Sequence, residues 1–198
     1  VKVALLPNGL FLLSDMIGRN GHQCWPEALR GIWGYWHQLP AGHRYNLQLK
    51  RQEDWYESWD CSHEGFEGIR AQDILPLLIE RFEFELFLPF GAIIDAFVGR
   101  AFGHHLDADS ADDCAWVDRI HQRDEAAILS GEWTPTHLVA ALTVGEPGQR
   151  LWSRGLTPQA CVRRPERDRD AGLPSLAQLQ TFFDRCGGTD KDYLAAHY

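Results

Sequence analysis

VKVALLPNGLFLLSDM, residues 1–16, is the stretch of sequence that decides the fold. It holds a turn signal, Pro7-Asn8-Gly9, followed by a continuous apolar run from Leu10 to Leu13. Because this run lacks the alternation of a half-buried strand, it predicts a strand buried on both faces in the middle of a parallel sheet. Only two other convincing strands follow, both far downstream. We therefore expect the second half of an α/β domain, whose first half lies upstream of Val1.

Five helices and two further strands are expected downstream of this run. The helical pattern covers residues 26–37, 46–59, 71–81, 93–102 and 110–129, and the strand pattern covers 82–88 and 136–144. Pro26 suits the first turn of its helix, and Ser110 suits an N-cap. Residues 145–173 are predicted to be a connector, and Ser175 is predicted to begin a short amphipathic helix that stops at Gly187.

The composition is that of a globular chain, with 198 residues of which 44% are hydrophobic and 24% are charged. The net charge is −9, and the acidic residues are concentrated in residues 51–150. An acidic body does not suit a nucleic-acid groove, which needs clustered Lys and Arg. No apolar stretch is long enough for a membrane span. The five cysteines are scattered, which argues for reduced thiols in a cytoplasm and against a disulfide framework (Cys24, Cys61, Cys114, Cys161 and Cys186).

Several separated segments resemble one known family. They are ALLPNGLFLLSDMIGRNGH from residue 4, WPEAL from 25, YNLQLKR from 45, WDCSHEGFEGIRAQDILPLL from 59, FEFELF from 82 and THLVA from 136. Together with the order of strands and helices, they resemble the carboxyl-terminal half of a class I S-adenosylmethionine-dependent methyltransferase. The similarity covers residues 1–164. It is to a bacterial subgroup that is often found with glycosyltransferases in surface-polysaccharide clusters.

The resemblance implies a Rossmann-like sheet of which this chain supplies the last three strands. It implies a methyltransferase domain over residues 1–144, with a largely helical acceptor-binding insertion at 23–81, followed by the connector and short helix of 145–198. The implied reaction is transfer of a methyl group from S-adenosylmethionine to a hydroxyl of a saccharide or related metabolite. Class I enzymes hold this cofactor with a Gly-rich turn after the first strand and an acidic residue ending the second. Neither feature is present, so the cofactor site is expected upstream of Val1 and the isolated chain is expected to be inactive.

Two other classes of function stay open. In the first, the chain is a non-catalytic binding module that kept an acceptor cleft and lost the cofactor half. In the second, it is a truncated fragment that self-associates, because the sheet edge beside Leu10–Leu13 is open to another strand. Saccharide binding without S-adenosylmethionine binding would favour the first class. A monomer at every concentration would count against the second.

The loop after the first strand is the first candidate site. In open α/β sheets ligands bind beyond the carboxyl ends of the strands, and Ser14, Asp15, Arg19, Asn20 and His22 are expected just past that end. Methyl transfer to a hydroxyl needs an aligned nucleophile and the removal of a proton. His22 and Asp15 are therefore the candidate catalytic bases, and Arg19 and Asn20 are candidate acceptor contacts. In the alternative interpretation, Asp15 caps the loop and His22 hydrogen-bonds to the backbone.

A second candidate site follows at WDCSHEGFEGIR, where two glycines predict a mobile loop that could act as a lid. Trp59 is expected to stack on a sugar, and Asp60 to hydrogen-bond to it. Arg70 offers a fork for a phosphate or carboxylate, such as the diphosphate of a nucleotide sugar. In the alternative interpretation, Arg70 pairs with Asp73 or Glu67 and holds the start of the following helix.

Other residues are weaker candidates. Trp25, in the WPEAL segment, is a further indole that is predicted to contact the substrate. His104 and His105 resemble a metal site by composition, but adjacent histidines on a loop rarely face one ion, so no metal is expected. The acidic residues that follow are predicted to face water (Asp112, Asp113, Asp118, Asp124 and Glu125).

Overall fold

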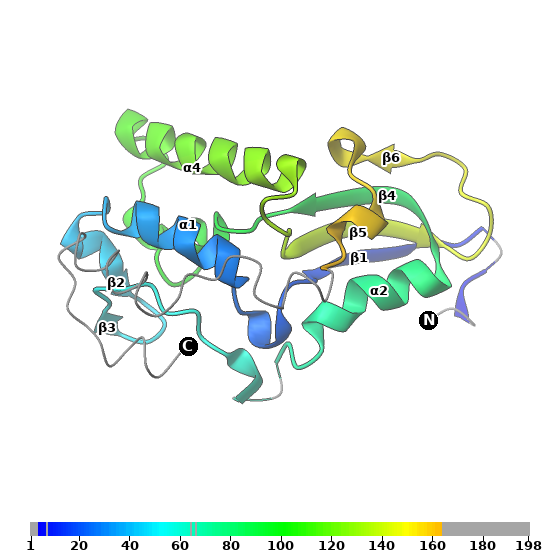
Figure 1. The fold of residues 1–198 in the computed structure, drawn as a ribbon, viewed down its shortest axis with the longest axis horizontal. Helices are drawn as coiled ribbons and strands as arrows, with labels where there is room; N and C mark the ends of the chain where they lie inside the picture. The colour runs from blue at the N-terminus through cyan, green and yellow to red at the C-terminus, as the bar shows by residue number, and fades with distance from the viewer. Residues whose placement is uncertain (1–3, 7, 64, 66, 164–198) are drawn as a thin grey trace. The chain divides into compact units, whose positions relative to one another are not determined.

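The computed structural model describes residues 4–6, 8–63, 65 and 67–163, all within a compact unit, Val1–Arg163. The helix predicted from Ser175 lies outside the described residues. The described part combines a four-stranded mixed sheet with α-helices (Figure 1). The predicted α/β class is therefore confirmed. No helix in the described part is both long and apolar enough to cross a membrane.

The three predicted strands lie side by side in the sheet. They are β1 (Phe11–Met16), β4 (Glu83–Phe90) and β5 (His137–Thr143), and the short strand β6 (Leu151–Trp152) joins them. The strand order is β1-β5-β4-β6. β5 runs antiparallel to both β1 and β4, whereas β6 runs parallel to β4. The carboxyl ends of β1 and β4 therefore reach the same end of the sheet as the start of β5.

The prediction of burial on both faces is wrong for the first strand. β1 borders the described sheet and pairs with β5, and Leu12 lies opposite Ala141. Phe11 and Leu13 pack against the core, but Leu12 is 72% exposed. A strand alternates its side chains between two faces whatever its composition. The apolar run therefore predicts the strand correctly, but it does not predict that one face of the strand is exposed.

One face of the sheet is covered by α2 (Ala71–Arg81), which has the predicted bounds. Figure 1 shows this helix running along the sheet, and its Leu75 and Leu78 belong to the same apolar cluster as Phe87 and Leu138. Phe87 and Leu138 are completely buried. The rest of the buried cluster comes from the loop after β1, from β4 and β5, and from the region after β6 (Ile17, Phe84, Ala140, Leu142 and Cys161).

A second, aromatic core lies in the helical part of the chain. α1 (Pro26–Trp36) begins with Pro26 in its first turn, as predicted. The ring of Trp36 lies 4.8 Å from that of Phe102 and 5.5 Å from that of Tyr56, measured between centroids. The long helix α4 (Ala111–Ser130) is capped as predicted, since the Ser110 side chain accepts a hydrogen bond from the N–H of Asp113. Figure 1 shows α1 and α4 beyond the end of the sheet to which β4 points.

The helix predicted over residues 46–59 is not formed. The chain instead makes a small hairpin of β2 (Tyr45–Asn46) and β3 (Arg51–Gln52), followed by chain without regular secondary structure. The side-chain oxygen of Asn46 accepts hydrogen bonds from two following N–H groups, at 3.0 and 2.9 Å. Such side-chain bonds to the backbone compete with helical hydrogen bonds and favour a turn.

The helix predicted over residues 93–102 is only a single turn, α3 (Asp95–Val98). It ends there because Gly99 takes an extended conformation, with ψ 175°. The remaining helical elements are short 3-10 turns (Asn20–His22, Ala41–Arg44, Cys61–His63, Gly103–His105, Ser153–Gly155 and Pro158–Cys161).

Residues 145–163, predicted as a connector, pack against the sheet. β6 pairs with β4, and the indole N–H of Trp152 donates a hydrogen bond to the carbonyl of Phe84 at 3.4 Å. Cys161 is 4% exposed and belongs to the core under the sheet. This segment therefore contributes to the stability of the same unit as the strands.

Candidate functional site

The loop after β1 lies against the loop that precedes α2, at the end of the sheet where β1 and β4 finish. The N–H of Ile17 donates to the carbonyl of Thr136 at 2.7 Å, and the N–H of Gly21 donates to the carbonyl of Gly68 at 2.8 Å. Gly18 packs so closely on Thr136 that an added Cβ would lie 2.8 Å from the Thr136 side chain. The two candidate sites predicted from the sequence are therefore neighbours in the fold.

Two glycines with left-handed backbones hold these loops together. Gly21 has φ +71° and Gly68 has φ +66°, a region that L side chains rarely adopt. An added Cβ on Gly21 would lie 1.9 Å from Oδ1 of Asp60, and one on Gly68 would lie 1.8 Å from the ring of His22. The side chains of Asp60 and His22 therefore occupy the space that these glycines leave free.

Asp60 is held as an ionised carboxylate. Its Oδ1 accepts hydrogen bonds from the N–H and the hydroxyl of Ser62, at 2.9 and 2.5 Å. Its Oδ2 lies 3.6 Å from Nε2 of His63. The Ser62 hydroxyl lowers the pKa of Asp60 below its ordinary value, and the charges of His63 and Arg19 act in the same direction. Asp60 is therefore an acceptor and not a proton donor at neutral pH.

Arg19 and His22 lie close enough to this cluster to act on it electrostatically. Arg19 stabilises the charged form of Asp60, and His22 acts on the imidazole of His137. His22 has a positive φ of 57°, and both Arg19 and His22 are partly exposed. Three of the residues predicted from the sequence, Arg19, His22 and Asp60, are thus brought into one cluster.

His137, the first residue of β5, is not among the candidate residues that the sequence indicates. Its Nδ1 lies 3.0 Å from the hydroxyl oxygen of Thr136, and its ring stacks on that of Phe90 with centroids 5.3 Å apart. Burial lowers the pKa of His137, the carboxylate of Asp95 raises it, and His22 lowers it. The sequence pattern indicates only that His137 belongs to a strand, because it does not show that β5 begins where β1 and β4 end.

Cys24 and Tyr56 lie beside the cluster but are not nucleophiles. The thiol of Cys24 lies 3.9 Å from the Tyr56 hydroxyl, and the N–H of Cys24 donates to the hydroxyl of Ser58 at 2.8 Å. Burial raises the pKa of Cys24 to about 11 and that of Tyr56 well above its ordinary value. Both groups therefore stay protonated at neutral pH.

Asp15 and Asn20 are placed differently from the expectation. Asp15 belongs to β1 and does not follow it, so the predicted position past the strand end is wrong; the same holds for Ser14. The exposed Asp15 carboxylate accepts a hydrogen bond from the N–H of Met16 at 2.8 Å. Asn20 is tied to the start of α2, because its side-chain oxygen accepts from the N–H of Gln72 at 3.3 Å. Neither geometry favours contact with a substrate.

Among the remaining predicted contacts, Trp59 has the most open aromatic surface, since it is 41% exposed. Trp25 is only 6% exposed, and the guanidinium of Arg163 lies 4.2 Å above its ring. Arg70 donates to Asp73 at 2.7 Å, which confirms the alternative interpretation of that residue. Of the two indoles, Trp59 therefore offers the more open surface.

S-adenosylmethionine is the cofactor that the resemblance implies, and the G-x-x-G loop after β1 does not fit it. A Gly-rich loop that binds a nucleotide presents free backbone N–H groups beside open space. The N–H of Gly21 is instead donated to Gly68, and the space beside Gly21 holds the Asp60 carboxylate.

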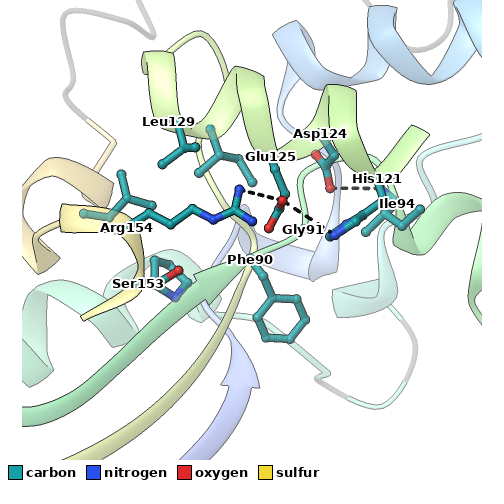
Figure 2. Close-up of a pocket in the computed structure, with 12 residues that line it drawn as sticks. Phe90, Gly91, Ile94, His121, Asp124, Glu125, Leu129, Ser153 and Arg154 are labelled. Atoms are coloured by element: carbon teal, nitrogen blue, oxygen red, sulfur yellow. Dashed lines mark hydrogen bonds and ion pairs between the residues drawn. The ribbon is translucent and has the colours of Figure 1, made fainter. Parts of the chain in front are cut away.

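Figure 2 shows a separate hollow between α4, the end of β4 and Arg154. Glu125 pairs with Arg154 at 2.6 Å and lies 3.6 Å from Nε2 of His121. The hollow has a volume of about 60 Å³, whereas ligand pockets have roughly 300–1,000 Å³. It is therefore too small for a substrate of sugar size.

Asp124, on the wall of this hollow, corrects another expectation. It was predicted to face water but is 1% exposed. Its carboxylate accepts hydrogen bonds from the N–H groups of Ala92 and Ile93, at 3.0 and 3.1 Å. Burial raises the pKa of Asp124, and these hydrogen bonds oppose the rise. The residue therefore satisfies the backbone that leads from β4 into α3.

A larger groove, of about 390 Å³, lies between the end of α1 and the start of α4 and includes His43 in its lining. The ring of His43 is stacked on that of His105, with centroids 5.6 Å apart and planes inclined by 8°. Within the described residues, no group of three or more His, Cys, Asp and Glu side chains is arranged to hold a metal ion.

Comparison of the chain with models of protein families, with curated proteins and with solved structures gives no match.

Proposed function

We propose that this chain forms the acceptor-binding side of an S-adenosylmethionine-dependent methyltransferase that O-methylates a saccharide or a related small metabolite. The single observation that carries the proposal is that the loops of His22 and Asp60 contact each other where β1 and β4 end and where His137 begins β5. Ligands of open α/β sheets bind at that end. The resemblance of the segments to the carboxyl half of class I methyltransferases supplies the reaction class.

Each side chain of the cluster suits one task toward an acceptor. The ionised carboxylate of Asp60 accepts hydrogen bonds from sugar hydroxyls, and the indole of Trp59 offers a face on which a sugar ring stacks. Arg19 suits an anionic group of the acceptor, such as a diphosphate. The two imidazoles, His22 and His137, each offer a ring nitrogen that can accept a proton. Positioning supplies most of the rate in such a reaction, and proton removal adds to it.

The proposal assigns the cofactor to a part of the enzyme other than the described residues, because the G-x-x-G loop at Gly21 is filled by Asp60. It places the enzyme in the cytoplasm, with no nucleic acid and no membrane among its partners. Titration of S-adenosylhomocysteine into the chain, followed by calorimetry, is expected to give no heat of binding. Micromolar binding would contradict this assignment of the cofactor.

Saturation-transfer NMR with a panel of hexoses and nucleoside-diphosphate hexoses tests the acceptor site. We expect saccharide signals that Trp59→Ala and Asp60→Asn abolish. The control is Tyr45→Ala, which removes an aromatic ring of similar exposure, 37% against 41% for Trp59. No signal from any saccharide at millimolar concentration would overturn the proposal.

Self-association is a second candidate, favoured by one observation. Leu12 is 72% exposed on β1, the strand that borders the described sheet. An open, apolar border strand is a template for pairing with another strand. A non-catalytic chain that binds through this strand would keep the fold and lack the reaction.

A further inference from the structure

The hydroxyl group of Thr136 fixes the positions of the protons around His137. Its oxygen lies 2.8 Å from the carbonyl oxygen of Gly91 and 3.0 Å from Nδ1 of His137. A carbonyl oxygen can only accept, so the single hydroxyl proton is donated to Gly91. The other contact is then a hydrogen bond that Nδ1–H of His137 donates to the Thr136 oxygen.

This arrangement selects one tautomer of the imidazole. A neutral imidazole carries one N–H, and with that proton on Nδ1 the other nitrogen, Nε2, has an unshared electron pair. Nε2 makes no hydrogen bond with any described residue. No described residue therefore uses its electron pair.

Packing against neighbouring residues also fixes the orientation of the His137 ring. It stacks on Phe90 with planes inclined by 24°, and a Cβ on Gly91 would lie 3.0 Å from Nδ1. The backbone N–H of Thr136 donates to the same Gly91 carbonyl at 2.6 Å. A proton-accepting group that is fixed before the substrate binds loses little freedom in the reaction.

Two neighbours set the charge balance of the ring, Asp95 at the start of α3 and His22 in the loop after β1. The carboxylate of Asp95 favours the protonated imidazole, and a protonated His22 disfavours it. Burial keeps His137 neutral at rest by lowering its pKa. The site therefore holds a neutral base beside a carboxylate that stabilises its protonated form.

We propose that Nε2 of His137 takes the proton from the hydroxyl of the acceptor in this site. This inference rests on the proposed function and names the base within it. The O–H bond of the acceptor breaks, the proton bonds to Nε2, and the electron pair stays on the oxygen, which becomes the nucleophile. The resulting imidazolium keeps its Nδ1–H bond to Thr136, and the charge of Asp95 stabilises it. His22, which packs against Gly68, is then a neighbour that contacts the acceptor.

Nitrogen NMR of the whole chain, labelled with ¹⁵N at histidine, tests the tautomer without any assay of methyl transfer. We expect His137 to show the Nδ1–H form, with a titration midpoint below the ordinary histidine value of about 6.5. Thr136→Val keeps the shape of the side chain and removes the acceptor, so both tautomers should then appear. His22→Gln, the matched control, should keep the Nδ1–H form and raise the midpoint, and Asp95→Asn should lower it.

An Nε2–H form in the wild-type chain, or an unchanged tautomer in Thr136→Val, would overturn the inference. The same sample is then titrated with a saccharide that binds in the saturation-transfer experiment. A shift of the Nε2 resonance supports the role of His137, and binding without such a shift overturns that role while the proposed function stands. If no saccharide binds, the proposed function fails and the acceptor role of His137 fails with it.

Discussion

The carboxylate of Asp60 lies beside the α-carbon of Gly21, in the space that a side chain at position 21 would need. Gly21 takes φ +71°, so both its backbone and its surroundings require glycine. This contact joins the loop after β1 to the loop before α2, and it holds Asp60 in the candidate site.

Gly21→Ala is expected to destabilise the fold. A left-handed backbone alone costs an L residue about 1–2 kcal/mol, and the new methyl group would displace Asp60. Urea denaturation should therefore show a free energy of unfolding lowered by at least about 1 kcal/mol. Loss of saccharide binding should accompany it.

Gly34→Ala is the matched control for this change. Gly34 lies within α1 and has nothing within 4 Å of an added Cβ. Alanine stabilises a helix interior by roughly 0.5–1 kcal/mol relative to glycine, so the free energy of unfolding should rise. Equal effects of the two substitutions would contradict the assignment of a structural role to the Asp60–Gly21 contact.

Arg163→Lys is expected to destabilise the fold by about 1 kcal/mol. The guanidinium lies 4.2 Å above the ring of Trp25, contacts both carboxylate oxygens of Glu27 at 2.6 and 2.8 Å, and belongs to a side chain that is 8% exposed. Lysine cannot reproduce a planar group that stacks on the indole ring. Thermal and urea unfolding measure the loss.

The chain offers a similar pair in an exposed position as a control. Arg150 lies 5.5 Å above the ring of Trp152 and 3.1 Å from Glu83, but the side chains of Arg150 and Glu83 are 54% and 55% exposed. Exposed ion pairs contribute little, so Arg150→Lys should change the stability by less than about 0.5 kcal/mol. A loss of stability as large as that of Arg163→Lys would show that burial does not determine how much such a pair contributes.

Asp124→Ala should be among the most destabilising single changes in α4. It would leave the buried N–H groups of Ala92 and Ile93 without their acceptor, and each unsatisfied buried donor costs about 1–3 kcal/mol. We expect a loss of at least about 2 kcal/mol in urea denaturation. Asp118→Ala, an exposed change in the same helix, should have almost no effect.

Asp124 should also make the stability depend on pH in a particular direction. Burial raises its pKa in the folded state, so the folded chain binds this proton more tightly than the unfolded chain does. The stabilisation is therefore complete below the unfolded pKa of about 3.9 and is lost as the pH rises through the folded pKa. The advantage of the wild type over Asp124→Asn should fall as the pH rises through this range. An advantage that is constant or grows would contradict the sign.

The sequence predicted the regular elements best where the periodicity was long or the termini carried clear signals. α2 and α4 were found because their apolar spacing and the Ser110 cap are local properties. The helix predicted over residues 46–59 does not form because the hydrogen bonds from the Asn46 side chain to the backbone favour a turn over a weak helical pattern. The predicted burial of β1 on both faces is wrong because burial depends on neighbouring strands, which the local sequence does not encode.

The same distinction applies to the candidate site. Arg19, His22 and Asp60 were found because they lie in Gly-rich loops next to predicted elements. His137 was missed because its role depends on the antiparallel insertion of β5 between β1 and β4. Asp124 was misjudged because the N–H groups that it accepts come from residues far away in the sequence. The sequence pattern within one helix or strand predicts that element, whereas it does not predict contacts between segments that are far apart in the sequence.

Leu12→Lys tests whether β1 pairs with a second copy of the chain. Because Leu12 is 72% exposed and Leu138 on the neighbouring strand is fully buried, the lysine variant should keep its stability within about 0.5 kcal/mol. Leu138→Ala should lose about 2–5 kcal/mol. If the wild type associates through β1, its sedimentation coefficient should rise with concentration, and Leu12→Lys should suppress that rise because a charge on a border strand disfavours pairing. A wild type that sediments as a monomer at every concentration would contradict association through this strand, and would leave acceptor binding at the opposite end of β5 as the function to pursue.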